Sequence, residues 1–247
     1  MPKQKPKMIL FDYGQTLAHE PTFDSCAGNA ALLRYATHNP NNLTAEQAGI
    51  FADRLWGESG ITKARALDVE IHSDMFDRLL YETLQIGFSI SPPEMERVFW
   101  DAAAPGEMMV NVDKLLDYLW THNIRTGVIS NISFSGQGLK DRINHLFPHN
   151  HFEFIIASSE YIVRKPNPLI FELALRKANL AAENVWFCGD NIAVDILGAN
   201  QVGMFPVWYH SPLPCDYRDK KLDVPPECDH LYIRDWLELI DTLEELP

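Results

Sequence analysis

The sequence predicts an α/β protein with a parallel sheet core and an inserted bundle of helices. Two observations lead to this fold class. From residue 112 onward, patterns typical of helices alternate with short apolar patterns typical of strands, which indicates a parallel sheet covered by helices on both faces. Between residues 19 and 105, only helical patterns follow one another. A chain of 247 residues is long enough for one such core and a smaller inserted domain.

The first strand is predicted over residues 8–11, where four apolar residues precede Asp12. Such a run is too hydrophobic for a surface strand, so we expect it inside the sheet. Parallel sheets bind ligands beyond the carboxyl ends of their strands, which would present Asp12 to a crevice. The alternative is that Asp12 only caps a turn or a helix. This segment by itself supports both interpretations equally.

The helical block that follows is predicted to contain four helices and to end at Pro105-Gly106. Two of the helices have clear N-terminal signals, because Thr44 begins a capping box with Gln47, and Ser91 precedes two prolines and an acid. The helices are expected at residues 25–37, 44–56, 70–85 and 92–103.

The second half of the chain supplies the rest of the core. Helices are expected at residues 112–121, 136–146, 168–179, 192–200 and 234–245. Strands are expected at residues 125–130, 152–158, 184–190, 204–209 and near 230–233. A proline-rich loop at residues 211–227 precedes the last strand. Because the first strand belongs to the same sheet, the helical block is an insertion into the core.

The composition excludes several classes of function. A net charge of -13 without a basic patch disfavours nucleic acid as a partner. No apolar run approaches the roughly 20 residues of a membrane span, and the basic start precedes too few apolar residues for a signal peptide. The nine histidines lack a zinc-binding pattern. The four cysteines lack C-x-x-C spacing and predict free thiols in a reducing cytoplasm, although a Cys215–Cys228 bridge is conceivable.

Three further segments place polar residues where predicted strands end or helices begin. Ser130 and Asn131 follow an apolar strand, and Lys165 directly precedes a helix that starts with prolines. Gly189-Asp190 follows another apolar strand, and Asp195 comes about one helical turn later. Because these strands belong to one parallel sheet, we expect their polar residues to face the same crevice as Asp12.

Taken in order, the Asp12 segment, the strand-terminal serine, the Lys-Pro pair and the Gly-Asp-x4-Asp segment resemble the motifs of the haloacid dehalogenase superfamily. They span residues 8 to 210, which is most of the chain. The resemblance implies a Rossmann-like core at residues 1–18 and 106–247, with a helical cap domain at residues 19–105. It also implies a hydrolase, in which Asp12 forms an aspartyl-phosphate that water then hydrolyses.

A carboxylate that attacks a phosphoryl group needs a cation to neutralise charge. Mg²⁺ suits this task because it takes oxygen ligands, and we expect Asp12 and Asp190 to be its carboxylate ligands. The resemblance implies a third ligand, the backbone carbonyl of Gly14. Three roles stay open for Asp195, namely a water-mediated metal contact, the orientation of Lys165, or a helix-terminus contact.

Two residue types are expected to meet the phosphate. Lys165 would balance the negative charge of the carboxylates and the phosphate. We expect it to point into the site because the prolines that follow it fix the direction of the chain. Ser130 would donate its hydroxyl, with neighbouring backbone N–H groups, including that of Asn131, adding a phosphate nest. Arg164 is expected to be an ordinary surface residue.

Gly14 departs from the family pattern, because phosphatases of this family usually carry a second aspartate there. That residue protonates the leaving group and activates water, a contribution worth about 10²–10⁴-fold in rate. We therefore expect slow hydrolysis of alkyl phosphates. Gln15 cannot supply a proton, whereas His19 can, although an exposed His19 at the hinge of the cap is the arrangement we expect.

The departure leaves other functions open. One is a non-catalytic or regulatory protein that retains the phosphate and metal sites. Another is a 2-haloacid dehalogenase, which needs no metal and carries a tyrosine where this chain has Gly14; here Tyr13 comes one residue early. A phosphonatase would need a special cap lysine, and Lys63 shows no such signature.

The expected ligand is a small phosphorylated metabolite, bound by a cytoplasmic monomer or homodimer without a membrane or nucleic-acid partner. In the helical block, several large or basic side chains are candidates for reading that substrate, although core packing or solvation is the favoured interpretation for them. They are Arg54, Trp56, Lys63 and Arg65.

Overall fold

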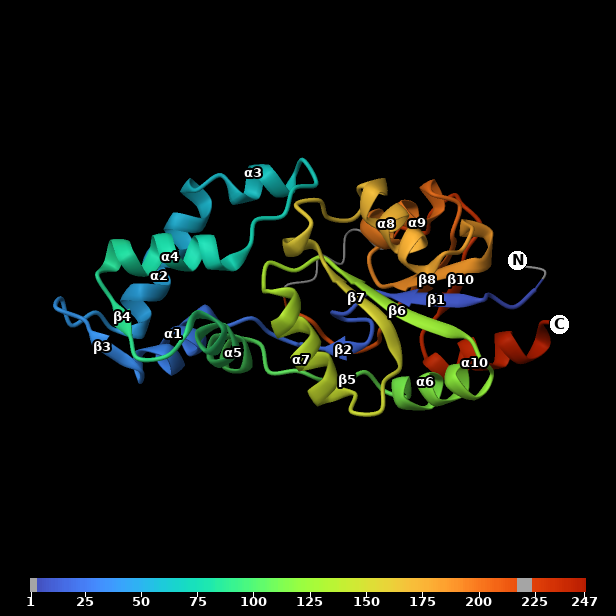
Figure 1. Cartoon of the computed structure of the whole chain (residues 1–247), viewed down its shortest axis with the longest axis horizontal. Coiled ribbons are helices and arrows are strands. Elements are labelled where there is room, and N and C mark those ends of the chain that lie inside the picture. The colour runs from blue at the N-terminus through green and yellow to red at the C-terminus, as the bar shows by residue number, and fades with distance from the viewer. Residues whose placement is uncertain (1–3, 217–223) are drawn as a thin grey trace.

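The computed structural model describes residues 4–216 and 224–247, which form a parallel sheet flanked by helices and a further group of helices at one end (Figure 1). The six strands lie in the order β10-β9-β8-β1-β6-β7, and every pairing is parallel. The predicted α/β class is therefore confirmed. The strands are β1 (Met8–Phe11), β6 (Arg125–Ser130), β7 (Phe152–Ala157), β8 (Val185–Gly189), β9 (Phe205–Tyr209) and β10 (Leu231–Ile233).

Strand β1 lies inside the sheet, between β6 and β8, and its four side chains are fully buried. Because side chains alternate along a strand, Ile9 and Phe11 face one layer of helices while Met8 and Leu10 face the other. The first layer is α6 (Val112–Thr121), α7 (Gly136–Leu146) and α10 (Trp236–Glu245), and the second is α8 (Pro168–Ala178) and α9 (Leu197–Gln201). This double cover explains why β1 is apolar on both faces.

The inserted segment forms its own hydrophobic cluster, which includes Leu32, Ala48 and Leu80. Its helices are α1 (Ser25–Leu33), α2 (Ala45–Glu58), α3 (Ile61–Arg65), α4 (Ser73–Leu84) and α5 (Pro92–Ala103). The capping box at Thr44 is present, as predicted. The expectation of helices alone was wrong, because β3 (Ala36–His38) pairs with β4 (Gly87–Phe88), so the first helix ends at Leu33.

A short antiparallel ribbon lies where the chain leaves the core and returns to it. It consists of β2 (Ala18–His19) and β5 (Glu107–Met108), which the sequence did not predict. The expectation of an exposed His19 was wrong, because the residue is only 6% exposed. Its ring nitrogens lie 2.9 Å from the carbonyl oxygen of Pro214 and 3.3 Å from Oε1 of Glu107.

The helix expected at residues 192–200 is divided in two. A π-helical turn at Ile192–Ile196 precedes α9, and the Asn191 side chain caps it by accepting a hydrogen bond from the backbone N–H of Val194. Turns of this kind are rare and often mark functional sites. Here the wide turn contains Asp195, which is 1% exposed.

Two expectations concern the whole chain. Within residues 4–216 and 224–247, no helix is long and apolar enough to cross a membrane. The cysteines, Cys26, Cys188, Cys215 and Cys228, are free thiols, and Cys188 is buried in β8 as predicted. Part of the predicted proline-rich loop, residues 217–223, lies outside the described residues.

Candidate active site

The carboxyl ends of β1, β6 and β8 meet at one edge of the sheet and border a cavity of about 540 Å³. Asp12 directly follows β1, Asp190 directly follows β8, and Ser130 is the last residue of β6. All three line the cavity, together with Lys165 and the other residues predicted for the site, Gly14, Asn131 and Asp195. Its volume lies in the range typical of small-molecule sites.

Lys165 is the buried centre of this group. It is 1% exposed, and its Nζ lies 2.8 Å from Oδ1 of Asp12 and 2.7 Å from Oδ1 of Asp195. Burial disfavours the charged ammonium, but Asp12 and then Asp195 outweigh it and raise the pKa of Lys165. The side chain is therefore a fixed cation that holds two carboxylates in place.

Asp195 is buried beside Lys165, within the π-helical turn. Its Oδ2 accepts a hydrogen bond of 3.0 Å from the backbone N–H of Asn191. Burial raises the pKa of Asp195, and the Lys165 ammonium opposes that rise. Of the three roles left open by the sequence, the 2.7 Å contact supports the orientation of Lys165.

The donor set fits a hard divalent cation. One carboxylate oxygen from each of Asp12, Asp190 and Asp195 lies within 4.8 Å of the others. Oxygens around one octahedral Mg²⁺ are about 3–4 Å apart, given metal–oxygen distances of about 2.1 Å, so small side-chain movements would bring the cluster onto one ion. Oxygen-only ligands are the set that Mg²⁺ prefers over softer metals.

Asn131 has a role that the sequence did not reveal. Its side-chain amide bonds the backbone of Lys165 twice, since Oδ1 accepts from the N–H at 2.7 Å and Nδ2 donates to the carbonyl at 2.8 Å. The amide therefore fixes the chain from which the Lys165 side chain projects. Any contribution of Asn131 to phosphate binding would have to come from its backbone N–H.

The backbone at Gly14 does not require a glycine. Gly14 does not adopt a positive φ, whereas the next residue, Gln15, does, with φ of 58°. A Cβ atom added at Gly14 would meet nothing within 4 Å. Neither backbone conformation nor lack of space thus explains the glycine. Gln15 lines the cavity, and its Nε2 donates a 2.6 Å hydrogen bond to the backbone carbonyl of Glu20.

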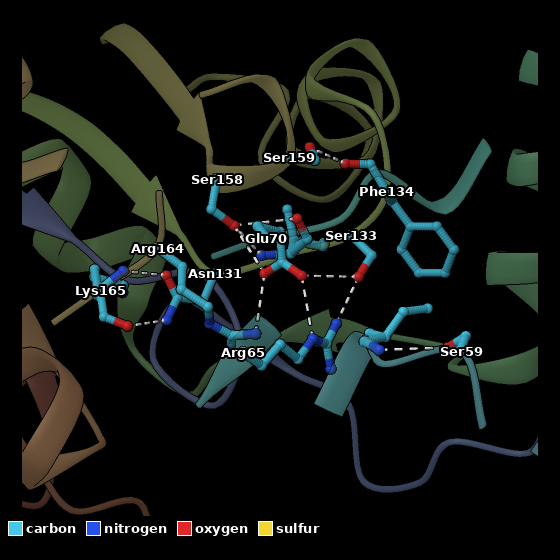
Figure 2. Close-up of polar contacts among 12 residues, drawn as sticks. Ser59, Arg65, Glu70, Asn131, Ser133, Phe134, Ser158, Ser159, Arg164 and Lys165 are labelled. Carbon is cyan, nitrogen blue, oxygen red and sulfur yellow. Dashed lines mark hydrogen bonds and ion pairs between the residues drawn. The ribbon is translucent and has the colours of Figure 1, made fainter. Parts of the chain in front are cut away.

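The sequence did not predict the charged cluster beside the same cavity, although Arg65 was one of its candidates. Figure 2 shows Arg65 from α3 and Arg164 from the loop before α8, both of which reach the carboxylate of Glu70. Both arginines line the cavity. The expectation that Arg164 is a surface residue was wrong, because its side chain is only 19% exposed and lies 3.1 Å from Glu70.

The candidate substrate-binding residues of the helical block differ in whether they line the cavity. Among the described residues that line the cavity, Arg65 is present but Arg54, Trp56 and Lys63 are not. Trp56 packs against Phe76, with ring centroids 5.2 Å apart, and the guanidinium of Arg65 lies 4.8 Å from its ring centroid. Packing was thus the right interpretation for Trp56.

A second buried network borders the site on the side of Glu20. Oε1 of Glu20 accepts hydrogen bonds from the Tyr13 hydroxyl at 3.1 Å and from Nε of Arg142 at 3.0 Å. Burial raises the pKa of Glu20, and Arg142 opposes that rise. Glu20 lines the cavity, whereas His19 is absent from the described part of the cavity wall. If a second acid serves the site, Glu20 is therefore better placed than His19.

Comparison with known proteins points to a family of hydrolases. Residues 103–208 match the family model described as haloacid dehalogenase-like hydrolase. Glyceraldehyde 3-phosphate phosphatase from Pyrococcus furiosus is 32% identical over 101 residues, which is 38% of this chain and 42% of that protein. Haloacid dehalogenase-like hydrolase domain-containing protein 3 from Homo sapiens is 29% identical over 158 residues, covering 62% of this chain and 60% of that protein. The chain thus spans about half the length of these relatives.

Solved structures extend the likeness over almost the whole chain. A 2-haloacid dehalogenase from Pseudomonas syringae is 22% identical, with a TM-score of 0.63, and the match covers 97% of this chain and 98% of that one. A phosphatase of the same superfamily from Thermococcus onnurineus is 18% identical, with a TM-score of 0.56 and the same coverage. At these identities the likeness shows the fold alone, and the fold is shared by dehalogenases and phosphatases.

Proposed function

Because this chain belongs to the haloacid dehalogenase-like hydrolase family, we propose that it is a Mg²⁺-dependent phosphatase of a small phosphorylated metabolite. One observation carries the proposal. Asp12, presented by a buried strand, lies 2.8 Å from a buried lysine and beside two further carboxylates, on the wall of a cavity. The named phosphatases among the relatives support the same reaction class.

In the proposed reaction, a carboxylate oxygen of Asp12 bonds to phosphorus while the bond from phosphorus to the leaving oxygen breaks. The electron pair leaves with that oxygen, which takes a proton from water. Water then attacks phosphorus and breaks the bond to Asp12, giving inorganic phosphate and the free carboxylate. Mg²⁺, when held by Asp12, Asp190 and the Gly14 carbonyl, would offset the negative charge of the phosphoryl oxygens.

The other residues bind and orient. Lys165 holds the Asp12 carboxylate through Oδ1 and keeps its charge for the incoming phosphoryl group, because Asp12 and Asp195 outweigh the cost of its burial. Asp195 and Asn131 hold Lys165 from its two ends, the ammonium and the backbone. Ser130 is 3% exposed at the end of β6 and is proposed to donate its hydroxyl to the phosphate.

We propose that residues 1–18 and 106–247 are the catalytic core and residues 19–105 a substrate-binding cap. A hydrophobic cluster formed by the helical segment alone supports this division, as does the β2–β5 ribbon at the junction, although Trp100 and Ala104 near that junction pack into the core cluster. The cap contributes Arg65 to the cavity wall. We propose a cytoplasmic location, which the free thiols support, and a monomer or homodimer.

A Mg²⁺-dependent assay tests the proposal. The purified protein should hydrolyse acetyl phosphate and para-nitrophenyl phosphate, whose leaving groups need little protonation, and excess chelator should abolish the activity. No turnover of either substrate, with Mg²⁺ and phosphate still raising the melting temperature, would favour a regulatory binding protein. Turnover of 2-haloacids in the presence of chelator would favour a dehalogenase.

A further inference from the structure

Glu70 is a fully buried carboxylate whose partners come from both the helical group and the core (Figure 2). Oε1 accepts hydrogen bonds from Nε of Arg65 at 3.1 Å and from the Ser133 hydroxyl at 3.2 Å. Oε2 accepts one from the Ser158 hydroxyl at 3.1 Å and lies 3.1 Å from Nη1 of Arg164. Each oxygen thus has one guanidinium and one hydroxyl partner, and Glu70 fixes the position of both arginines.

The cluster has one positive charge in excess, because two guanidinium groups share one carboxylate. Glu70 itself is not among the described residues that line the cavity, whereas Arg65 and Arg164 are. Their side chains are 34% and 19% exposed. Asp68 also lies near Arg164 but is likewise outside the described cavity lining. The cavity wall therefore presents two cations and hides the anion that holds them.

The two arginines also act on each other. Burial lowers the pKa of Arg164, Glu70 opposes this, and the nearby charge of Arg65 lowers it further. An anion between the guanidinium groups would relieve both the desolvation and the repulsion. Planar guanidinium forks are well suited to bind a carboxylate by paired hydrogen bonds.

The side chain of Arg164 reaches Glu70, whereas that of its neighbour Lys165 reaches Asp12, so the two cations have different partners. Arg164 immediately precedes Lys165, whose side chain extends to Asp12, and Arg65 comes from helix α3 of the inserted segment. The cavity that contains Asp12 and both arginines holds about 540 Å³, room for a metabolite that carries a second polar group.

We propose that Arg65 and Arg164 form a binding site for a carboxylate of the substrate, so that the enzyme prefers phosphorylated carboxylic acids. This inference rests on the proposed phosphatase function. A carboxylate carries a single negative charge and matches the single positive excess of the cluster, whereas a second phosphate would exceed it.

Two matched pairs of compounds test the site. 3-Phosphoglycerate differs from glycerol 3-phosphate, and 2-phosphoglycerate from glycerol 2-phosphate, by a carboxylate in place of a CH₂OH group. We expect kcat/KM with Mg²⁺ to be about tenfold or more higher for the acid in at least one pair, as charge-assisted hydrogen bonds would give. In Arg65→Gln and Arg164→Gln this ratio should fall to about twofold, and Arg65→Lys should retain part of it.

Arg78→Gln is the matched control, because Arg78 forms an exposed ion pair with Asp74 on α4, and its ratio should stay that of the wild type. If Arg164→Gln fails to fold, the more exposed Arg65 carries the test. A ratio near one in both pairs, in wild-type protein that hydrolyses para-nitrophenyl phosphate, overturns the carboxylate site alone. A ratio unchanged in stably folded Arg65→Gln does the same, since it would mean that the cluster only ties the helices to the core.

A protein that hydrolyses none of these phosphates overturns the phosphatase proposal instead. Calorimetric titration of the same pairs then decides the binding site separately. A tenfold tighter affinity for the acid, lost in Arg65→Gln, supports the site, and equal affinities within both pairs overturn it.

Discussion

Two of the ion clusters that border the cavity have opposite composition. In the first, the single cation of Lys165 lies between the carboxylates of Asp12 and Asp195. In the second, the single anion of Glu70 lies between the guanidinium groups of Arg65 and Arg164. One cluster thus has a negative excess and the other a positive excess. Because uncompensated buried charge is costly, the first is expected to attract a metal cation and the second an anion.

The largest expected effect breaks the first cluster at its nucleophile. Asp12→Asn should lower the hydrolysis of para-nitrophenyl phosphate by about 10³-fold or more, because an amide cannot form the acyl-phosphate. Activity is measured on purified protein whose folding is verified by circular dichroism. Asp113→Asn, an exposed aspartate at the start of α6, is the matched control and should keep full activity. Activity near that of the wild type in folded Asp12→Asn would contradict the assignment of Asp12 as the nucleophile.

The next effect breaks the second cluster and appears in stability. Glu70→Gln removes the carboxylate that both arginines contact and should lower the free energy of unfolding by about 2–4 kcal/mol. The usual cost of leaving a buried charge unpaired is about 3–5 kcal/mol, and the partial exposure of both arginines reduces it here. Urea unfolding measures the loss.

The control for Glu70 is Asp74→Asn, which removes the partner of Arg78 in an exposed pair. Its cost should be at most about 1 kcal/mol, as for other surface pairs. Equal losses in the two variants would show that the Glu70 cluster is no more than a surface contact.

The third effect returns to the negative cluster. Asp190→Ala should raise the Mg²⁺ concentration needed for half-maximal activity by about tenfold to hundredfold, since it removes one of the converging carboxylates. The rise in melting temperature on adding Mg²⁺ should shrink in parallel, a readout independent of turnover. Asp113→Ala serves as the control. An unchanged Mg²⁺ midpoint in Asp190→Ala would remove Asp190 from the ligand set.

The two clusters also differ in how far the sequence predicts them. Asp12, Ser130 and Asp190 adjoin strands whose apolar runs are visible in the sequence, and a parallel sheet brings such strand ends together. Glu70, by contrast, contacts Ser133 and Ser158, which are 63 and 88 positions away. From the sequence alone, charged residues so far apart are expected to be solvated surface groups. Their contacts arise only when the helices pack against the core.

The length of an element decides whether the sequence predicts it. The strands of the sheet and the long helices have apolar periodicity of their own and were placed within a few residues. Strands β2, β3, β4 and β5 have two or three residues each, and α3 has five, too short for a periodic signal. They exist because tertiary partners pair with them, which local sequence does not encode.

The smallest expected effect sharpens the comparison at Gly14, the cavity residue where the usual second carboxylate is missing. Gly14→Asp should speed the hydrolysis of alkyl phosphates by about tenfold, less than the full 10²–10⁴-fold of an evolved acid. The change is sterically open, because Gly14 lacks a positive φ and an added Cβ would meet no atom within 4 Å. Gly14→Ala, which adds the Cβ alone, is the control. Hydrolysis of para-nitrophenyl phosphate, whose leaving group needs little protonation, should change little.

The wild type itself provides the complementary measurement for Gly14. Without an acid for the leaving group, its rate should fall steeply as the leaving-group pKa rises, and slow attack of water should allow the phosphorylated Asp12 to be trapped. A flat dependence on leaving-group pKa, with no gain in folded Gly14→Asp, would mean that another residue already acts as the acid. Glu20 is then the group to change, because it is a buried carboxyl with a raised pKa on the wall of the same cavity, whereas the ring of His19 lies against Pro214 and Glu107. In that case Glu20→Gln should restore the steep dependence.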